Sequence, residues 1–345
     1  MYSADAEKFR FGPEFSAGFD GARVFITGAS KDGGIGQAFA LAAALNGAES
    51  VGVHFHSSYQ DGFDLVAELE KHGVSAFPVQ ADVTNPRDLW ATRSYVIDQM
   101  GGKPPSLVIC NSGLTESGYS FGRALRPVED ESIAMRRARV RQHFIESLDE
   151  SRLVLDTKID GFMGVTHLWA GEAVYHQSPL RIVYVSSRQA IDPGPAVPGY
   201  AISNWAVLQL PRVLEVNLGR SAEFVSALSV LFPFVRTGMT DAYAENEKVF
   251  GRWQPRMLET HECAQAFAQL MARPVEETNS GMFELMVDSI DESSNEGVSR
   301  GDDSSGSDES SGSGDTDQVA VTWRQVKFNI DEAPLGWSSS QPLIY

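Results

Sequence analysis

The sequence predicts an α/β fold in which a doubly wound parallel sheet is covered by helices on both faces. Two observations support this prediction. Short apolar runs alternate along the chain with longer amphipathic stretches, and a glycine-rich turn lies directly between the first run and the first helix. A length of 345 residues fits one large domain of this kind with extensions.

The apolar runs are short and nearly continuous, which is typical of parallel strands buried on both faces. The predicted strands are residues 24–26, 51–55, 76–80, 106–110, 181–185, 225–231 and 282–287. The helices predicted between the first four strands are residues 36–45, 63–72 and 88–100. We expect these elements to form a single domain over residues 21–288, preceded by a polar leader over residues 1–20.

Three stretches depart from this alternation. Residues 114–150 are too long for an ordinary loop and predict an insertion, either a lid or a helix that contacts a partner. Residues 289–318 are rich in Ser, Gly, Asp and Glu with hardly any apolar side chain, and predict a disordered acidic linker. Residues 319–345 form a C-terminal tail. Within it, residues 319–328 alternate weakly between apolar and polar side chains, which predicts a short strand.

The composition excludes several classes of function. The chain carries 28 Lys and Arg against 46 Asp and Glu, a net charge of −18, which opposes binding to nucleic acid or to anionic membranes. There is no apolar run long enough to span a membrane and no secretory signal. The two cysteines lie in apolar contexts and suggest a reduced, cytoplasmic protein. His54 and His56 alternate on one strand without a third ligand, so we expect no metal.

The glycine-rich turn predicts a nucleotide site. Glycines in this position let the backbone approach a pyrophosphate, and the N-terminus of the following helix offers unpaired N–H groups to the anion. A glycine-rich turn that binds nothing is the alternative. The cofactor contacts expected from the turn come from Thr27, Gly28, Ser30, Gly34, Ile35 and Gly36.

The ends of the neighbouring strands strengthen the prediction, because open α/β sheets of the Rossmann type bind ligands there. Asp82 and Val83 end the third strand, where an acid meets an adenine amino group, and Asn111 ends the fourth. The second strand ends at His56 and Ser57 without an acid for a ribose 2′-hydroxyl. Neutral or cationic groups there suit a 2′-phosphate, which favours NADP(H) over NAD(H).

The chain resembles the short-chain dehydrogenase/reductase family over about residues 20–288. The resemblance is carried by the turn at 27–36, by Asp82, by the Asn111-Ser112-Gly113 triplet, and by Ser187 and Tyr200, which are 13 residues apart. It implies that Ser187 and Tyr200 act on a substrate carbonyl. It also implies that Thr237, after the sixth strand, contacts the nicotinamide carboxamide. Phe234 stands where many members have glycine, and we expect it to serve simple packing.

Two departures from the family pattern compensate each other. The lysine usually found four residues after the tyrosine is replaced by Asn204, and Lys158 stands upstream where asparagine is usual. This exchange is similar to the ketoreductase domains of modular polyketide synthases. Tyrosine has a pKa of about 10 and relays protons poorly at neutral pH unless a cation favours the phenolate. Lys158 is expected to supply that cation and bind the ribose, while Asn204 supports the proton relay.

The resemblance implies an NADPH-dependent ketoreductase whose ketone is a free or carrier-bound β-ketoacyl or polyketide-like compound. The arginines within residues 136–141 either form a solvated helix face, which the sequence favours, or receive an acidic carrier. Two other functions stay open: a dehydratase, isomerase or cyclase using the same residues, and an inactive nucleotide-binding scaffold. The resemblance is also compatible with a homo-oligomer.

Overall fold

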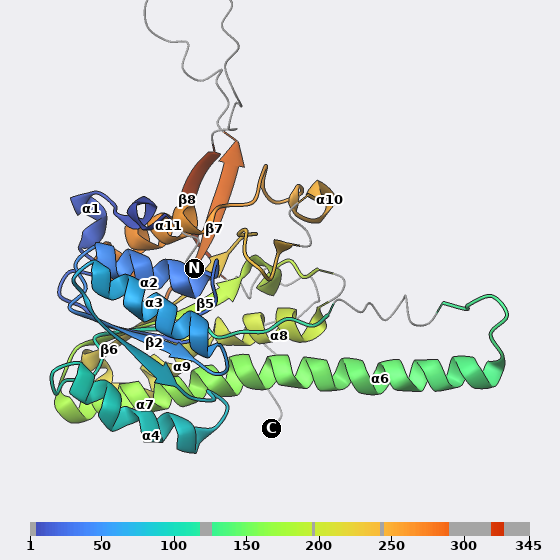
Figure 1. Cartoon of the computed structure of the whole chain (residues 1–345), viewed down its shortest axis with the longest axis horizontal. Helices are drawn as coiled ribbons and strands as arrows, with labels where there is room; N and C mark the ends of the chain where they lie inside the picture. The colour runs from blue at the N-terminus through green and yellow to red at the C-terminus, as the bar shows by residue number, and fades with distance from the viewer. Residues whose placement is uncertain (1–4, 118–125, 195–196, 242–244, 290–318, 328–345) are drawn as a thin grey trace, which may run out of the picture.

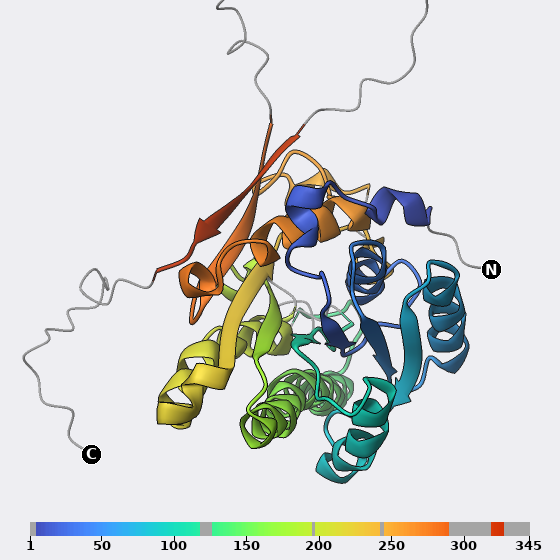
Figure 2. The same ribbon diagram turned by 90° about the vertical axis from the view of Figure 1, so that its left-hand side faces the viewer.

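The computed structural model describes residues 5–117, 126–194, 197–241, 245–289 and 319–327. Its centre is an eight-stranded sheet with the order β3-β2-β1-β4-β5-β6-β7-β8 (Figure 2). The first seven strands are parallel and β8 is antiparallel to β7. This confirms the predicted single α/β domain with a doubly wound parallel sheet.

Every strand expected from the apolar runs is present within a few residues. The strands are β1 Arg23–Ile26, β2 Ser50–Phe55, β3 Ser75–Gln80, β4 Leu107–Cys110, β5 Leu180–Ser187, β6 Val225–Phe232, β7 Met282–Ser289 and β8 Val319–Gln325. β1 pairs with both β2 and β4, so the strand order reverses at the end of β1. A ligand crevice is expected at this reversal in an open α/β sheet.

Helices cover both faces of the sheet. The helices α2 Ile35–Leu45, α3 Tyr59–Lys71 and α11 Thr260–Met271 lie on one face, and α4 Pro86–Gln99, α7 Gly161–His176 and α9 Leu210–Leu218 lie on the other (Figure 2). The remaining helices are η1 Ala6–Phe9, α1 Pro13–Ser16, α6 Ile133–Leu155, η2 Asp156–Asp160, η3 Arg188–Ala190, α8 Pro198–Val207, η4 Gly219–Phe224, α10 Glu247–Phe250 and α12 Val275–Thr278.

Each face of the sheet has its own apolar core. Phe39 of α2 packs on Phe267 of α11 with ring centroids 4.3 Å apart. On the other face, Phe25 of β1 packs on Trp169 of α7 at 5.4 Å. The expected leader contributes to the first core, since Phe9 and Phe19 are both buried. The described part of that leader therefore packs against the domain.

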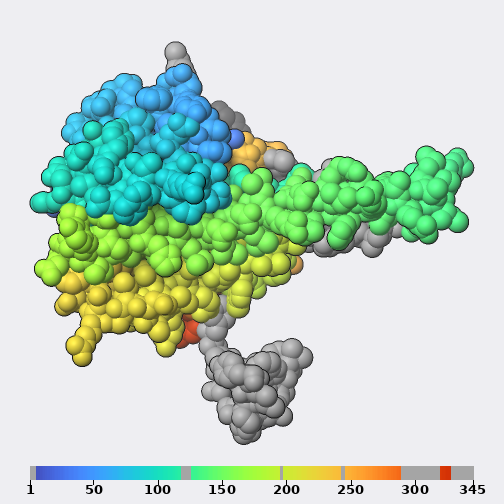
Figure 3. All heavy atoms as spheres, turned by 90° about the horizontal axis from the view of Figure 1, so that it is seen from below, coloured from blue at the N-terminus to red at the C-terminus, as the bar shows by residue number. Residues whose placement is uncertain are grey.

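The insertion at residues 114–150 contains the start of α6, a 23-residue helix that protrudes from the body of the protein (Figures 1 and 3). The Ser132 hydroxyl caps its first turn by accepting a hydrogen bond from the Met135 amide at 3.2 Å. Val154, one residue before its end, is its one fully buried residue. A single π-helical turn, η2, joins α6 to α7 without a break in the helical backbone.

The expected short strand in the tail is present as β8, which covers the edge of the sheet beside β7. The Trp323 indole donates a hydrogen bond to the Ala266 carbonyl of α11 at 2.7 Å. The neighbouring Arg324 pairs with Glu284 of β7. The predicted acidic linker, apart from its first residue, lies outside the described residues, as do residues 328–345 of the tail.

The glycine-rich turn is held by a histidine that lies beneath it. Gly28 has a φ of +62°, a conformation that glycine adopts without strain. Its N–H donates to Nδ1 of His54 at 3.2 Å, and the Ala29 N–H donates to the His54 carbonyl at 2.9 Å. Burial lowers the pKa of His54 to about 4. The imidazole is therefore neutral at physiological pH and able to accept from Gly28.

This arrangement predicts a stability that depends on pH. In the unfolded chain His54 takes up a proton below its ordinary pKa of about 6.5, whereas in the folded chain it stays neutral until about 4. The His54 contribution is fully present above pH 6.5 and is lost as the pH falls to 4. Over that window, His54 is expected to lower the free energy of unfolding by about 3 kcal/mol.

Denaturant unfolding at several pH values, analysed for His54→Asn and for His56→Asn, measures this contribution. The asparagine at position 54 keeps a hydrogen-bond acceptor but does not titrate. The decrease in the free energy of unfolding between pH 6.5 and 4 should therefore be smaller than in the parent. His56 is exposed, and His56→Asn should show the same dependence of the free energy of unfolding on pH as the parent. Equal pH dependence in the parent and in His54→Asn would contradict the buried neutral histidine.

Candidate active site

The glycine-rich turn is tied to the end of β4, as expected for a shared ligand crevice. The Thr27 hydroxyl accepts hydrogen bonds from the amides of Asn111 and Ser112 at 2.9 and 3.1 Å. The Asn111 side chain donates to the Gly28 carbonyl at 3.0 Å. A Cβ at Gly36 would lie 2.5 Å from the Asn111 amide nitrogen, so only glycine fits there. Asn111 thus supports the turn from behind.

Gln37 of α2 orders the tip of the turn. The Gln37 side chain donates to the Asp32 carboxylate at 3.1 Å and accepts from the Gly33 amide at 2.8 Å. These bonds hold Asp32 against the helix. The next turn residues expected to bind a cofactor differ in exposure: Ser30 is buried, while Gly34 and Ile35 at the start of α2 are partly exposed.

The residues expected at the adenosine end lie at the carboxyl ends of β2 and β3. His56 and Ser57 are exposed just beyond β2, where no acid stands beside them in the chain. The Asp82 carboxylate accepts hydrogen bonds from the Thr84 amide at 2.9 Å and from its hydroxyl at 2.7 Å, so it shapes its own turn. Val83 is buried. Contacts of these residues with a nucleotide remain predictions.

Ser187, Tyr200 and Asn204 are brought together by the packing of α8 on the end of β5. Burial raises the pKa of the Tyr200 phenol, and the nearby polar side chains of Ser187 and Asn204 oppose that rise. The phenol is therefore protonated at neutral pH and lies near both side chains. Ser186, one position out of the family register, bonds instead to the Asn204 carbonyl at 2.8 Å.

Asn204 is fully buried and makes one bond within its own helix. Its Nδ2 donates to the Tyr200 carbonyl at 2.8 Å, one helical turn earlier. Its Oδ1 has no hydrogen-bond partner among the described residues. A buried acceptor of this kind usually bonds to a water or to a ligand. The asparagine thus has one free acceptor beside the phenol.

Lys158 lies in the π-helical turn η2 and is directed into the protein. Its side chain is 5% exposed, and its Nζ lies 4.9 Å from the centre of the Phe162 ring. A Cβ added at Gly113 would lie 3.5 Å from the same Nζ, so the amine reaches the segment just after β4. Burial lowers the pKa of Lys158 to about 7. The turn that carries it packs against α8, which carries Tyr200.

An apolar pocket of about 570 Å³ opens beside this cluster, with Ser187 and Tyr200 in its lining. Phe234 also lines it and stacks on Trp253, with ring centroids 5.4 Å apart and planes 22° apart. The expectation that Phe234 serves packing alone was therefore incomplete, because the ring also forms a wall of the pocket. The Trp253 indole and the Arg252 guanidinium, which both belong to the lining of the pocket, donate hydrogen bonds to the Asp192 carboxylate.

Thr237 follows β6 at the edge of the same region. Its amide donates to the Thr240 hydroxyl at 3.0 Å, and Thr240 lines the pocket. On the next residue, a Cβ at Gly238 would lie 3.6 Å from Cε of Lys31 in the glycine-rich turn. The segment after β6 and the turn after β1 therefore face each other across the site. This is where the predicted carboxamide contact of Thr237 would be made.

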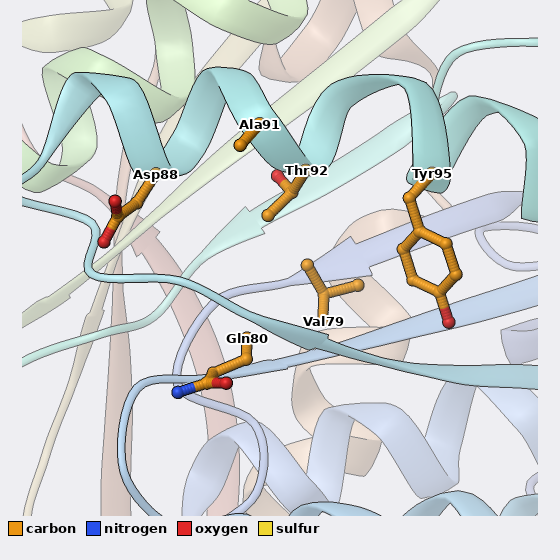
Figure 4. Close-up of a pocket in the computed structure, with 6 residues that line it drawn as sticks. All are labelled: Val79, Gln80, Asp88, Ala91, Thr92 and Tyr95. Atoms are coloured by element: carbon orange, nitrogen blue, oxygen red, sulfur yellow. The ribbon is translucent and has the colours of Figure 1, made fainter.

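A second hollow of about 350 Å³ lies between β3 and α4 (Figure 4). Val79 and Gln80 come from the strand, and the other four lining side chains from the helix are Asp88, Ala91, Thr92 and Tyr95. Neither Ser187 nor Tyr200 contributes to it. Its position at the edge strand separates it from the proposed chemistry.

Two residues of the site escaped the sequence reasoning. Glu116 is buried after β4 and accepts hydrogen bonds from the amides of Gly199 and Tyr200. His54 is the other, because the sequence did not predict its role in supporting the glycine-rich turn. No group of three or more His, Cys, Asp or Glu in the described residues is placed to hold a metal. Within the same residues, no helix is long and apolar enough to cross a membrane.

Known proteins are similar in sequence to this chain over more than half of its length. Residues 22–248 match the family model described as short chain dehydrogenase. The versicolorin reductase stcU of Emericella nidulans is 28% identical over 213 residues, covering 61% of this chain and 68% of that protein. The 3-oxoacyl-[acyl-carrier-protein] reductase FabG of Staphylococcus aureus is 24% identical over 225 residues, covering 65% and 79%.

Solved structures show the same fold. A 3-oxoacyl-[acyl-carrier protein] reductase from Brucella melitensis aligns with a TM-score of 0.61 at 21% identity, covering 82% of this chain and 95% of its own. A short chain dehydrogenase from Burkholderia cenocepacia in complex with NADP aligns with a TM-score of 0.60 at 20% identity, covering 77% and 96%. With the family model matching well over half of its length, the chain belongs to the short-chain dehydrogenase/reductase family of oxidoreductases.

Proposed function

We propose that the protein is an NADPH-dependent ketoreductase that reduces a β-ketoacyl or polyketide-like ketone to a secondary alcohol. The observation that carries this proposal is the meeting of Ser187, Tyr200 and Asn204 at an apolar pocket, with the buried Lys158 on the adjoining helical turn. The names of the two relatives support it, since one acts on 3-oxoacyl groups and the other is a versicolorin reductase.

Each residue has a defined task in this proposal. The Ser187 hydroxyl donates a hydrogen bond to the substrate carbonyl oxygen, and the Tyr200 phenol gives that oxygen its proton. Burial keeps the phenol protonated at neutral pH, as an acid requires. Once the proton has left, the positive charge of Lys158 stabilises the phenolate. The free Oδ1 of Asn204 accepts from a water that returns a proton to the tyrosine.

The turn after β1 and the end of β4, which hydrogen bonds of Thr27 and Asn111 tie together, are suited to a dinucleotide. The bound nicotinamide would supply the hydride. The turn from Thr27 to Gly36 would hold the pyrophosphate at the start of α2, and Asp82 and Val83 would meet the adenine. His56 and Ser57 would take the 2′-phosphate, and Thr237 the carboxamide. Lys158, which reaches the end of β4, would donate hydrogen bonds to the ribose hydroxyls.

Loss of the phenol or of the lysine should remove most of the activity. We expect Tyr200→Phe and Lys158→Ala to lower kcat by about 100-fold or more, because proton delivery is impaired while the nucleotide turn stays intact. NADPH absorbance measured with a panel of β-keto thioesters and cyclic ketones gives the rates. Tyr175→Phe, which removes a hydroxyl from an exposed tyrosine on α7, is the matched control.

The same assay separates the rival functions. Turnover of a substrate without consumption of NADPH would favour a dehydratase, isomerase or cyclase. Binding of NADPH with no turnover on any ketone would favour a nucleotide-binding scaffold. If Tyr200→Phe kept at least half of the parental kcat, the tyrosine would have no part in the proposed mechanism.

The choice between the two nicotinamide cofactors should depend on the end of β2. Ser57→Asp places a carboxylate where it bonds to a 2′-hydroxyl and repels a 2′-phosphate. We expect the ratio of kcat/KM for NADPH to that for NADH to fall by about 10-fold or more. Ser178→Asp adds the same charge just before β5, at the amino ends of the parallel strands and away from the end of β2, and should leave the ratio unchanged. A parent enzyme that prefers NADH would refute the assignment.

A carrier-bound substrate would have to dock on an acidic protein whose net charge opposes an acidic carrier. The arginine run on the exposed surface of α6 offers an opposite charge. We expect Arg137→Glu with Arg141→Glu to lower kcat/KM for a carrier-bound β-ketoacyl group by about 10-fold and to spare the free thioester. Equal effects on both substrates would exclude docking at α6.

A further inference from the structure

Glu116 joins the three segments on which the candidate site is built. It lies six residues beyond β4, and 7% of it is exposed. One carboxylate oxygen accepts from the Gly199 amide and from the Ser151 hydroxyl, the latter at 3.0 Å. The other accepts from the Tyr200 amide at 3.2 Å. A single buried carboxylate thus holds the segment after β4, helix α6 and helix α8 together.

The bonds to α8 take the place of an ordinary helix cap. The N-cap residue Val197 has no side chain that can accept a hydrogen bond, and Pro198 has no N–H to donate. The next two amides, of Gly199 and Tyr200, belong to the first turn and have no acceptor within the helix. Glu116 accepts from both of them. Its negative charge also lies at the positive end of the helix dipole, where it is stabilised.

The close fit of the three segments leaves little freedom at this point. A Cβ on Gly199 would lie 2.6 Å from a Glu116 carboxylate oxygen and 3.0 Å from the Ser151 backbone. Ser151 belongs to the same continuous helical stretch as Lys158, seven residues earlier. The contact therefore sets the start of the helix that carries Tyr200 against the helix that leads to Lys158.

We propose that Glu116 is a positioning residue that fixes the Tyr200 phenol relative to Lys158 and to the substrate carbonyl. Glu116 acts through the backbone of α8 and takes no part in proton transfer itself. This inference rests on the proposed ketone reduction for its kinetic consequence. Its structural consequence, an ordered first turn of α8, stands independently of the reaction.

The test compares Glu116→Ala with Glu150→Ala. Glu150 is the matched control, because it accepts from the Ser117 hydroxyl at 2.9 Å and so ties the same segment to α6 without touching α8. A displacement of about 1 Å at a reacting group costs on the order of 100-fold in rate. We expect Glu116→Ala to lower kcat by about 10- to 100-fold, with KM for the ketone and Kd for NADPH within threefold of the parent.

Rescue and hydrogen exchange separate positioning from general stability. Glu116→Gln keeps one acceptor oxygen and should recover at least a third of the parental kcat. Amide exchange in residues 198–207 should be about 10-fold faster in Glu116→Ala and unchanged in Glu150→Ala. Exchange is measured without turnover, so a parent that reduces no ketone refutes the proposed function while the exchange result still decides the role of Glu116.

Three results would overturn the inference. These are a folded Glu116→Ala with kcat within twofold of the parent, unchanged exchange in residues 198–207, and an equal loss of kcat in Glu150→Ala. If Glu116→Ala does not fold, Gly199→Ala replaces it, because its methyl group would push the carboxylate away. Gly199→Ala should then lower kcat by about 10-fold, and parental activity in this variant would equally refute the role of Glu116.

Discussion

The burial of the Lys158 amine is the constraint on which the candidate site depends. An ammonium group removed from water is unfavourable unless its surroundings compensate, and here burial lowers its pKa to about 7. The amine lies between the Phe162 ring, whose centre is 4.9 Å from Nζ, and the backbone at Gly113. The π-helical turn sets its direction, because one extra residue per turn rotates the side chains that follow. π-Helical turns are frequent at functional sites for this reason.

The segment that follows β4 connects the other parts of the site to this lysine. Asn111 supports the glycine-rich turn, Gly113 lies beside the Lys158 amine, and Thr115 lines the apolar pocket. Glu116 then caps α8. Successive residues of one extended segment thus reach the nucleotide crevice, the cation, the pocket and the tyrosine helix. A shift of this segment would move all four together, so the proposed hydride and proton transfers share one support.

Periodicity predicted the sheet because buried parallel strands leave continuous apolar runs, and each of those runs forms a strand. The glycine-rich turn and the Ser187–Tyr200 spacing could also be recognised in the sequence, because both are patterns of residues close together in the chain. The role of Glu116 was not, because the two α8 amides that it accepts from are more than eighty residues away and its sequence context is that of a surface loop. His54 was read together with His56 as one of two alternating histidines, but His54 lies within the buried strand β2, whereas His56 lies just beyond its end and is exposed. The antiparallel direction of β8 also depends on tertiary pairing alone.

The last strand, β8, is linked to the lining of the pocket by a buried carboxylate. Glu284 of β7 is fully buried and pairs with Arg188 at 2.9 Å and with Arg324 of β8. Arg188 lines the substrate pocket next to Ser187. Two arginines share this carboxylate, Arg188 being the more buried of them and Arg324 the more exposed, so both contribute to compensating its charge. β8 therefore does more than cover the edge of the sheet: its arginine neutralises a carboxylate that holds a wall of the pocket, and the C-terminal strand is part of the structural support of the site.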